Sequence, residues 1–269
     1  MVQLGRHYAF GKNWLKYSQT IDSSHVESVT SDLAELLNIG DLKNKSVLDI
    51  GCGSGVHDVG FYHLGCRNLT AIDYDLDSIV ATKYNLEKFC PDAEFKILQG
   101  DILSEEIKLL GTFDIVYSWG VLHHTGNLEA AIDNSASLVA DEGFLAIALY
   151  RKTLLCDFWK IEKRVYSRLP RFFQKFFELI YISTFALRLI MVKKISIVQY
   201  IKNYSTKRGM NFFADVRDWL GGYPYESISS DELRKLMSSL GFSQVYSLEG
   251  HDKIGIFGSG CDEFLFQKL

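Results

Sequence analysis

A short apolar run leads directly into three closely spaced glycines in the stretch VLDIGCGSG, residues 47–55. The apolar part predicts a buried strand, and Gly51, Gly53 and Gly55 predict a tight turn before a helix. Glycine has no Cβ, so it adopts positive φ readily and lets backbone N–H groups approach a ligand. In doubly wound sheets, such turns lie at the carboxyl ends of parallel strands, where ligands bind. The stretch therefore favours an α/β fold with a ligand site at the glycine turn.

Short apolar runs alternate with helix-like segments between Lys45 and Tyr150. Residues 77–89 and 128–139 have the apolar spacing of helices, and the runs between the helices are rich in β-branched and other apolar residues. This strand–helix–strand order is typical of βαβ units and a parallel sheet. The predicted strands are 46–50, 68–73, 94–99, 113–118 and 143–150.

The pattern changes after Tyr150. Residues 151 to about 220 predict several helices in which aromatic and basic residues are interleaved, so we interpret this segment as an insertion. The alternation then returns, with Ser230 expected to cap a helix that Gly241 ends. The predicted strands that follow are 243–248 and the tail 261–269.

Composition and charge exclude several classes of protein. The 269 residues are 47% hydrophobic and 23% charged, which is typical of a globular protein. The net charge of −4 gives no overall reason to bind nucleic acid. The five cysteines are scattered without a CxxC pair, and no HExxH or DxDxDG spacing occurs, so we expect no disulfide framework and no metal site. The N-terminal sequence lacks an apolar signal segment, so we expect a cytoplasmic protein.

Carboxylates follow the predicted strands at positions that suit a nucleoside ligand. Asp73 ends the second strand, 18 residues after the third glycine, close to the spacing at which an acid meets ribose hydroxyls. Asp101 follows the third strand, where it and Ile102 could edge an adenine ring. A dinucleotide dehydrogenase would have Gly or Ala where Val56 stands. Asp49 suits a ligand ammonium, so S-adenosylmethionine (SAM) accounts for Asp49 and Asp73 together.

The motifs VLDIGCGSG, AIDYD, LQGDIL and FDIVYSWGVLHHTGN resemble the ordered motifs of class I SAM-dependent methyltransferases. The similarity covers 47–150 and is greatest to the branch that includes ubiquinone-biosynthesis O-methyltransferases. Flanking stretches resemble a bacterial subgroup with FGKNW and DWLGGYPYE motifs. The resemblance implies an α/β, Rossmann-like, seven-stranded mostly parallel sheet with a helical insertion. The implied divisions are an N-terminal helical lid at 1–44, a SAM-binding core at 45–150, a substrate-binding insertion at 151–226 and completion of the sheet at 227–269.

The resemblance also implies SAM as cofactor and S-adenosylhomocysteine as product. It places Asp49 near the methionine amino group, Gly51 and Gly53 along the methionine moiety, and the residues from Ser118 to Gly120 at the methionine end. The residues that it predicts to bind the cofactor are Asp49, Gly51, Cys52, Gly53, Gly55, Asp73, Tyr74, Asp101, Ile102, Ser118, Trp119 and Gly120.

Methyl transfer to a hydroxyl requires a base, because the acceptor must lose its proton. His123 and His124 follow the fourth strand, and an imidazole suits this role near neutral pH. The alternative is that a histidine here only packs or bonds the backbone. The motif SWGVLHH differs from the NPPY or DPPY run of amino-methylases, so oxygen is the leading acceptor atom, with nitrogen or carbon open.

Two segments are candidates for the acceptor pocket. In YAFGKNWLKYS, the spacing of Phe10, Trp14 and Tyr17 places them on one helical face, which could simply pack on the sheet. By similarity to related methylases, it would instead be a lid that covers SAM and closes the pocket, with Trp14 and Tyr17 as candidate substrate contacts. The stretch 208–226 combines acids, an arginine and aromatic rings that can stack on a polar ring. Its candidate residues are Arg208, Asp215, Asp218, Trp219, Tyr223 and Glu226, with Cys261, Asp262 and Glu263 as weaker candidates near the C-terminus.

The segment 170–194 is strongly apolar with basic residues around it, but Glu178 and Arg188 interrupt it, so we do not expect it to span a membrane. It predicts either a lid helix or an interfacial helix that contacts a membrane and delivers a lipid-linked acceptor. We therefore expect O-methylation of a small or lipid-linked polar acceptor such as a sugar or a phenol. A methyltransferase acting on a peptide or RNA, and a non-catalytic SAM-binding regulator, are the alternatives.

Overall fold

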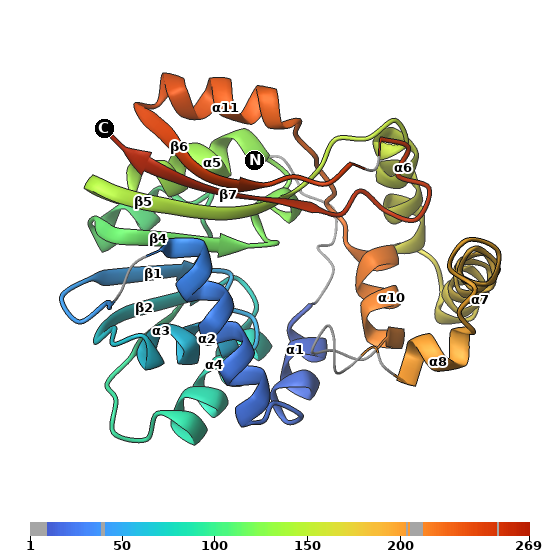
Figure 1. Ribbon diagram of the computed structural model, residues 1–269, viewed down its shortest axis with the longest axis horizontal. Helices are drawn as coiled ribbons and strands as arrows, with labels where there is room; N and C mark the ends of the chain where they lie inside the picture. Colours follow the sequence, from blue (N-terminus) through green and yellow to red (C-terminus); the bar gives the residue numbers. More distant parts are fainter. Residues whose placement is uncertain (1–9, 39–40, 203, 205–211, 252) are drawn as a thin grey trace.

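The computed structural model describes residues 10–38, 41–202, 204, 212–251 and 253–269. Its centre is a seven-stranded sheet in the order β3-β2-β1-β4-β5-β7-β6, in which β7 alone runs antiparallel to its neighbours (Figure 1). The predicted Rossmann-like, mostly parallel sheet is confirmed. The strands are β1 (Ser46–Ile50), β2 (Asn68–Asp73), β3 (Lys96–Gln99), β4 (Phe113–Trp119), β5 (Val139–Tyr150), β6 (Phe242–Leu248) and β7 (Cys261–Lys268).

Strand β5 starts four residues earlier than the sequence indicates. Its first residues, VADEG, contain the Asp, Glu and Gly that favour turns, so the sequence predicts a start at Gly143. In the structure Val139 pairs with Phe113, and the register with β4 then shifts before Phe144 pairs with Ile115. A bulge therefore absorbs these polar residues within the strand.

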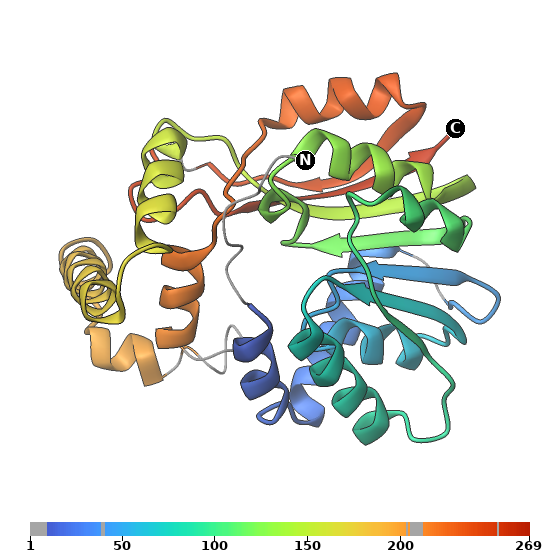
Figure 2. The same ribbon diagram turned by 180° about the vertical axis from the view of Figure 1, so that it is seen from behind.

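Helices cover both faces of the sheet. Alternate strand residues point to opposite faces, so Leu48 and Ile50 pack with α5 and α11, whereas Val47 packs with α2 and α3. Figure 1 shows α2 in front of the sheet, and Figure 2 shows α5 in front when the molecule is seen from behind. The helices of this part are α2 (Ser23–Leu37), α3 (Val56–His63), α4 (Leu76–Phe89), η1 (Glu105–Leu110), η2 (Leu122–His124), α5 (Leu128–Ser137) and α11 (Ser230–Ser239).

Helix α11 begins one residue earlier than predicted. The N-cap is Ser229 and not Ser230, because the Ser229 hydroxyl accepts a hydrogen bond from the backbone N–H of Glu232. The Glu232 carboxylate in turn accepts the N–H of Ser229, which completes a capping box. Two serines in succession offer the same cap, and the acid three residues after Ser229 selects the first.

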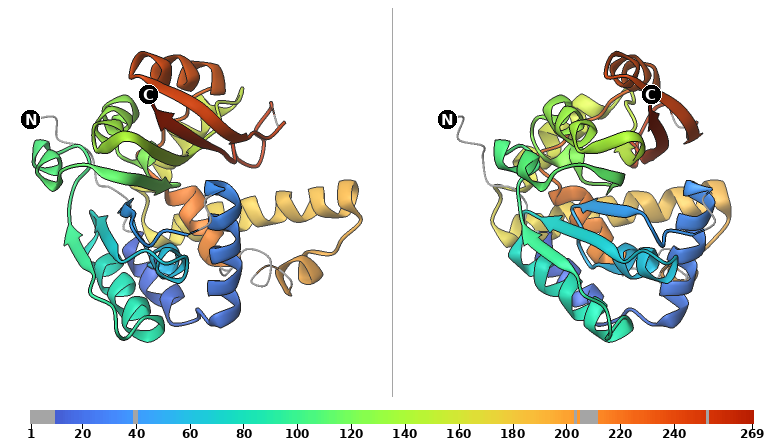
Figure 3. Two further views of the ribbon diagram at one scale, coloured as in Figure 1. Left: turned by 60° about the vertical axis from the view of Figure 1, so that its left-hand side comes forward. Right: turned by 90° about the vertical axis from the view of Figure 1, so that its left-hand side faces the viewer.

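Among the described residues between β5 and β6, the helices before α11 form a separate group beyond the carboxyl ends of the parallel strands (Figure 1). They pack on each other through aromatic rings, including Tyr166, Tyr204 and Phe212. Figure 3 shows α7 as a long rod on the outside of this group, with α8 folding back beside it. The elements are α6 (Cys156–Tyr166), α7 (Arg171–Arg188), the π-turn η3 (Leu189–Lys193), α8 (Ile197–Lys202) and α10 (Phe212–Gly221).

The N-terminal helix α1 (Gly11–Ser18) lies between the sheet domain and this helical group (Figure 1). Its first N–H, at Gly11, donates to the Asp75 carboxylate at 3.0 Å, at the start of α4. On the other side, the Asn13 side chain donates to Asp218 of α10. Helix α1 therefore links the two parts of the molecule above the ends of the strands.

Candidate functional site

A cavity of about 1140 Å³ lies where the strand ends, α1 and the helical group meet. Ligand sites usually enclose a few hundred to about a thousand Å³, so this cavity has room for two ligands side by side. Its core side is formed by residues after β1, β2, β3 and β4. Its other side is formed by α7, α8, α10 and the segment before β7.

The glycine turn after β1 has the backbone geometry that the sequence predicts. Gly51, Gly53 and Gly55 have φ of 81°, 56° and 75°, the region that favours glycine. A Cβ at Gly51 would lie 2.4 Å from Val121, and one at Gly53 would lie 3.3 Å from the Trp14 ring. Gly51 lines the cavity, whereas Gly53 and Gly55 do not. The turn is therefore packed closely from above by α1 and from the side by the loop after β4.

Asp73 fixes the glycine turn and faces the cavity. One carboxylate oxygen accepts the N–H of Gly53 at 3.1 Å, and the other accepts the N–H of Asp75 at 2.8 Å. Burial raises the pKa of Asp73, and these two hydrogen bonds oppose the rise. A carboxylate has about four acceptor positions, so two remain for hydroxyl groups of a ligand. Tyr74, next along the chain, is exposed and also lines the cavity.

The ends of β3 and β4 supply the remaining predicted cofactor residues. Asp101, Ile102, Trp119 and Gly120 all line the cavity. Ser118 is buried and does not line it; its hydroxyl donates to the Ile50 carbonyl at 2.9 Å and so holds the ends of β4 and β1 together. Cys52 is also buried outside the lining, and its Sγ accepts the Thr82 hydroxyl.

Asp49 lies beneath the glycine turn and not on the cavity wall. It is buried against a second carboxyl, Asp58 of α3. Burial and the nearby Asp73 charge raise the pKa of Asp49 to about 8, and burial also raises the pKa of Asp58. Without a cation nearby, this pair keeps a proton at neutral pH. A ligand ammonium above the turn would stabilise the charged form.

The two adjacent histidines have different environments. His123 is buried outside the cavity lining, and its ring stacks on Tyr150 at a centroid distance of 3.7 Å. Its Nδ1 accepts the Tyr150 N–H at 3.1 Å, so Nε2 carries the proton in the neutral ring. Burial lowers the pKa of His123 well below its usual range. Nδ1 of His123 already accepts a hydrogen bond and Nε2 carries a proton, so neither nitrogen can take a proton from the acceptor substrate.

His124 lines the cavity. Its Nδ1 lies 2.8 Å from the Pro224 carbonyl oxygen, which can only accept, so Nδ1 carries a proton. In the neutral ring, Nε2 is then the basic nitrogen. The ring lies between Phe10 and Tyr150, at centroid distances of 5.0 and 5.2 Å. The geometry therefore favours His124 over His123 as the candidate base.

The acceptor candidates divide between the cavity and its surroundings. Trp14, Asp215, Asp218, Trp219 and Tyr223 line the cavity, as do the weaker candidates Cys261 and Glu263. Arg208 lies outside the described residues.

Three other candidates have structural contacts instead. Tyr17 packs against Trp14 and His25 on the side of α1 away from the cavity lining. Glu226 donates its N–H to the His123 carbonyl, and its half-buried carboxyl lies at the start of α5. Asp262 forms an ion pair with Arg151 at 2.6 Å.

Several aromatic residues of the cavity are absent from the sequence-based candidates. They come from α7, α8, α10, the loop before β7 and position 204 between α8 and α10, and they are Tyr181, Phe185, Tyr200, Tyr204, Phe212 and Phe257. Tyr181 and Phe185 lie in the segment 170–194, whose sequence predicts an apolar helix. An aromatic ring that packs and one that faces a cavity have the same helical spacing, so sequence alone offers no signal that separates them.

Comparisons with known proteins agree with this architecture. A family model described as a methyltransferase domain matches residues 24–247. The chain is 27% identical over 128 residues to a ubiquinone biosynthesis O-methyltransferase of Pelagibacter ubique, covering 48% of this chain and 51% of that protein. It is 31% identical over 121 residues to a ribosomal protein L11 methyltransferase of Burkholderia mallei, covering 40% of each. The chain thus matches about half the length, or less, of these curated relatives.

Solved structures share the fold. A magnesium protoporphyrin IX methyltransferase from Synechocystis PCC 6803 with bound S-adenosylhomocysteine has a TM-score of 0.54 at 17% identity, covering 91% of this chain and 84% of that one. An O-methyltransferase family protein from Burkholderia thailandensis has a TM-score of 0.52 at 13% identity, covering 96% and 58%. At these identities the likeness concerns the arrangement of strands and helices.

Proposed function

The chain belongs to the methyltransferase domain family, and from this premise we propose that it transfers a methyl group from SAM to an oxygen of a small or lipid-linked polar acceptor. The observation that carries the proposal is the two-sided cavity. One side presents nucleoside-binding groups on strand ends, and the other presents aromatic rings and carboxylates on helices, with His124 between them. S-adenosylhomocysteine would be the second product.

The core side of the cavity fits SAM. Asp73 has acceptor positions for the two ribose hydroxyls, and Asp101 and Ile102 lie where an adenine edge would be met. Gly51 has no side chain, so a ligand can approach the backbone of the turn at this part of the cavity wall. Beneath it, the Asp49 and Asp58 pair supplies the negative charge that an ammonium group requires.

Bound SAM supplies an electrophilic methyl group on a sulfonium. The protein must align an acceptor oxygen with that methyl, accept the hydroxyl proton and exclude water. Nε2 of His124 is the atom we assign to accept the proton, with Nδ1 held by the Pro224 carbonyl. Trp219 and Tyr150 form an edge-to-face pair at 5.5 Å that can orient a flat acceptor. Helix α1 covers the glycine turn and excludes water.

An oxygen acceptor is supported by the ubiquinone biosynthesis O-methyltransferase among the relatives. A peptide acceptor is the second candidate, because the ribosomal protein L11 methyltransferase is also a relative. The cavity favours the first. It is lined by rings from four separate elements and is bounded by α1, whereas a peptide chain requires an open groove.

The test is transfer of labelled methyl from SAM by the purified protein into a bacterial extract, followed by separation of organic-soluble, small aqueous and macromolecular products. SAM binding is measured in parallel by calorimetry. Label in the organic or small aqueous fraction supports the proposal. Label confined to macromolecules would show that the acceptor is a macromolecule, and the proposed acceptor class would then be wrong. Absence of SAM binding would refute the proposal as a whole.

Asp73→Ala is the informative variant, and Asp92→Ala, at an exposed turn after α4, is the matched control. Loss of Asp73 removes the ribose acceptor and leaves the Gly53 and Asp75 N–H groups without their partner. We expect SAM affinity to fall by roughly 100-fold or more, since charge-assisted hydrogen bonds contribute about 1.5–3 kcal/mol each. The control should bind SAM as the wild type does.

A further inference from the structure

Helix α7 has an exposed apolar face. Phe172 is 78% exposed, Phe176 57%, Leu179 62% and Leu187 57%, and these residues follow one another at spacings of three, four or eight along one side of the helix. The apolar surface continues into the next turn at Ile190, Met191 and Val192. None of the eighteen residues of α7 is fully buried. Contiguous apolar surface of this kind on a protein marks an interaction site.

The opposite side of α7 faces the protein interior. Phe177, Tyr181, Ile182 and Phe185 pack with α8 and α10, and Tyr181 and Phe185 also line the cavity. Helix α7 therefore has apolar side chains on two sides, and the protein covers only one of them. Arg171, Gln174, Lys175 and Glu178 form a polar stripe between the two. The uncovered apolar side favours contact with a second apolar environment.

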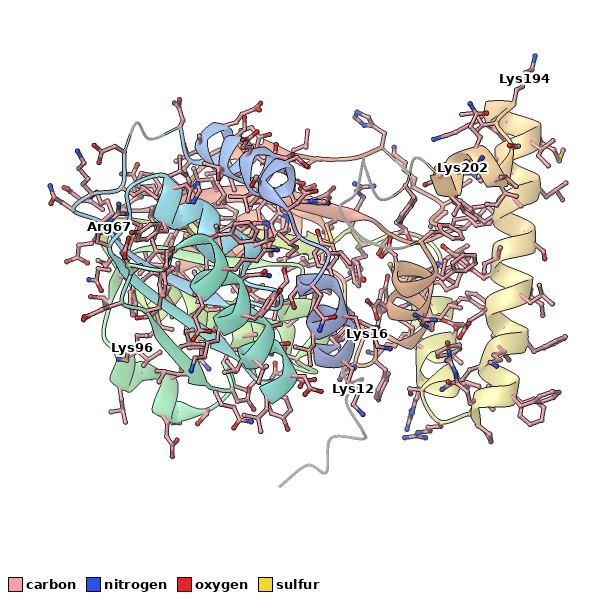
Figure 4. All side chains as sticks on the ribbon, turned by 90° about the horizontal axis from the view of Figure 1, so that it is seen from below. Lys12, Lys16, Arg67, Lys96, Lys194 and Lys202 are labelled. Carbon is pink, nitrogen blue, oxygen red and sulfur yellow. The ribbon has the colours of Figure 1, made fainter. Side chains whose placement is uncertain are left out.

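The net charge of residues 151–202, which include α7, is opposite in sign to that of the whole chain. Residues 151–202 contain twelve lysines and arginines against three acidic residues, a net charge of +9, whereas the whole chain has a net charge of −4. Within the part of the chain that the structure describes, Lys175, Lys193, Lys194 and Lys202 have no ion-pair partner. Figure 4 shows Lys194 and Lys202 at one end of the α7–α8 pair and Lys96 on the far side of the sheet domain. Some side chains of α7 lie on the side of the helix that faces away from the sheet domain.

We propose that the outer face of α7 docks on an anionic lipid surface, with its apolar side chains at the headgroup boundary and the surrounding lysines and arginines on the lipid charges. An apolar helix face with basic residues around it has the composition of an interfacial helix. Among the described helices none is long and apolar enough to cross a membrane, so the contact is peripheral. A second copy fits less well, because a two-fold contact would place this basic surface against itself.

Docking in this way would bring the acceptor side of the cavity to the membrane, because the same helix forms both surfaces. The inference stands on the surface of α7 and does not depend on the proposed methyl transfer. Its test is therefore done without SAM or acceptor, so that a failure of one proposal leaves the other unaffected.

The test is co-sedimentation of the full chain with vesicles of equal parts phosphatidylglycerol and phosphatidylcholine, compared with vesicles of phosphatidylcholine alone. We expect binding to the anionic vesicles that weakens when salt is raised from about 0.1 to about 0.5 M, because the lipid charges are then screened. Equal binding to both kinds of vesicle, or no binding to the anionic ones, would overturn the proposal.

Two sets of variants locate the contact. The charge variant is Lys193→Gln with Lys194→Gln. Each lysine near an anionic surface changes partitioning roughly fivefold, so we expect roughly 25-fold weaker binding. The apolar variant should lose most binding even at low salt, and it combines Phe172→Ser, Phe176→Ser and Leu179→Ser. The controls on the sheet domain should bind normally, and they are Lys83→Gln with Lys96→Gln, and Leu109→Ser with Val245→Ser and Leu248→Ser.

The substituted apolar side chains are more than half exposed and the substituted lysines are exposed, and thermal melts of each variant check that the fold is retained. If both α7 variants sediment as the wild type does, the face is not the lipid contact and the proposal is wrong. It is also wrong if the wild type ignores vesicles and elutes as a dimer that the apolar variant converts to a monomer. In that case the face is a self-interface.

Discussion

The adjacent histidines give opposite predictions, and substituting each in turn tests the assignment of the base. His124→Asn keeps an amide N–H that can donate to the Pro224 carbonyl but removes the basic nitrogen. Because a positioned general base contributes roughly 10²–10⁴ in rate, we expect methyl transfer at saturating SAM to fall by that factor. Stability should fall by only about 0.5–1.5 kcal/mol, because the ring contacts with Phe10 and Tyr150 are lost.

His123→Ala should have the reverse effect. It leaves the buried Tyr150 N–H without an acceptor, at a cost of about 1–3 kcal/mol, and it removes a ring stacked at 3.7 Å on Tyr150, worth about 0.5–1.5 kcal/mol. We expect a total loss of about 2–4 kcal/mol. In a chain of this length that lowers the melting temperature by about 5–15 °C. The transfer rate of the folded fraction should remain within about threefold of the wild type.

The assay is the initial rate of label transfer into the fraction of the extract that accepts methyl. Rates are normalised to SAM-binding protein and measured well below the melting temperature of both variants. Urea denaturation supplies the stability change. The assignment would be refuted if His124→Asn kept at least half of the wild-type rate, or if His123→Ala lost as much rate per folded molecule as His124→Asn.

Three further substitutions test the packing and the buried charges. Gly51→Ala places a Cβ 2.4 Å from Val121 at a φ of 81°. We expect backbone strain and overpacking to lower the free energy of unfolding by about 2–5 kcal/mol. Adding Val121→Ala should recover only the overpacking part in urea melts. Burial lowers the pKa of Lys163 from 10.5 to about 7, so the unfolded chain binds more protons than the folded chain between these pH values. Stability should therefore rise with pH across that range. Lys163→Met should abolish this rise in a pH series of melts. Burial raises the pKa of Asp58, so the folded chain keeps a proton that the unfolded chain loses above about pH 4, and stability should fall as pH rises from there; a slope unchanged in Asp58→Asn would contradict this.

The cofactor side of the cavity could be predicted from the sequence because its residues are tied to strand ends. The short buried strand β1 runs directly into the glycine turn, Asp73 ends β2 and Asp101 follows β3. The carboxyl ends of parallel strands lie at one edge of the sheet. The sheet therefore brings together residues whose spacing alone identified them. Where prediction was less accurate, as at the start of β5, a bulge accommodated residues that normally favour a turn.

The acceptor side could be predicted only in part. Residues of α10 such as Asp218 and Trp219 stood out by composition, and they do line the cavity. Tyr181 and Phe185 did not, because the side of a helix that faces a cavity depends on how that helix packs against its neighbours. Tyr17 shows the converse: it shares a helical face with Trp14 by spacing, yet the tilt of α1 places only Trp14 over the glycine turn.

This difference has a consequence for specificity. The cofactor side is held by backbone hydrogen bonds to Asp73 and by glycines that tolerate no Cβ, so substitutions there disturb the turn itself. The acceptor side consists mainly of aromatic rings on helices outside the sheet, so a side chain there can change while the turn keeps its geometry. Tyr181 joins α7 to the loop before β7 through its hydroxyl, which donates to the Phe257 carbonyl at 3.0 Å. Because α7 also carries the exposed apolar face, a shift of this helix on a lipid surface would move the acceptor wall and leave the SAM side in place.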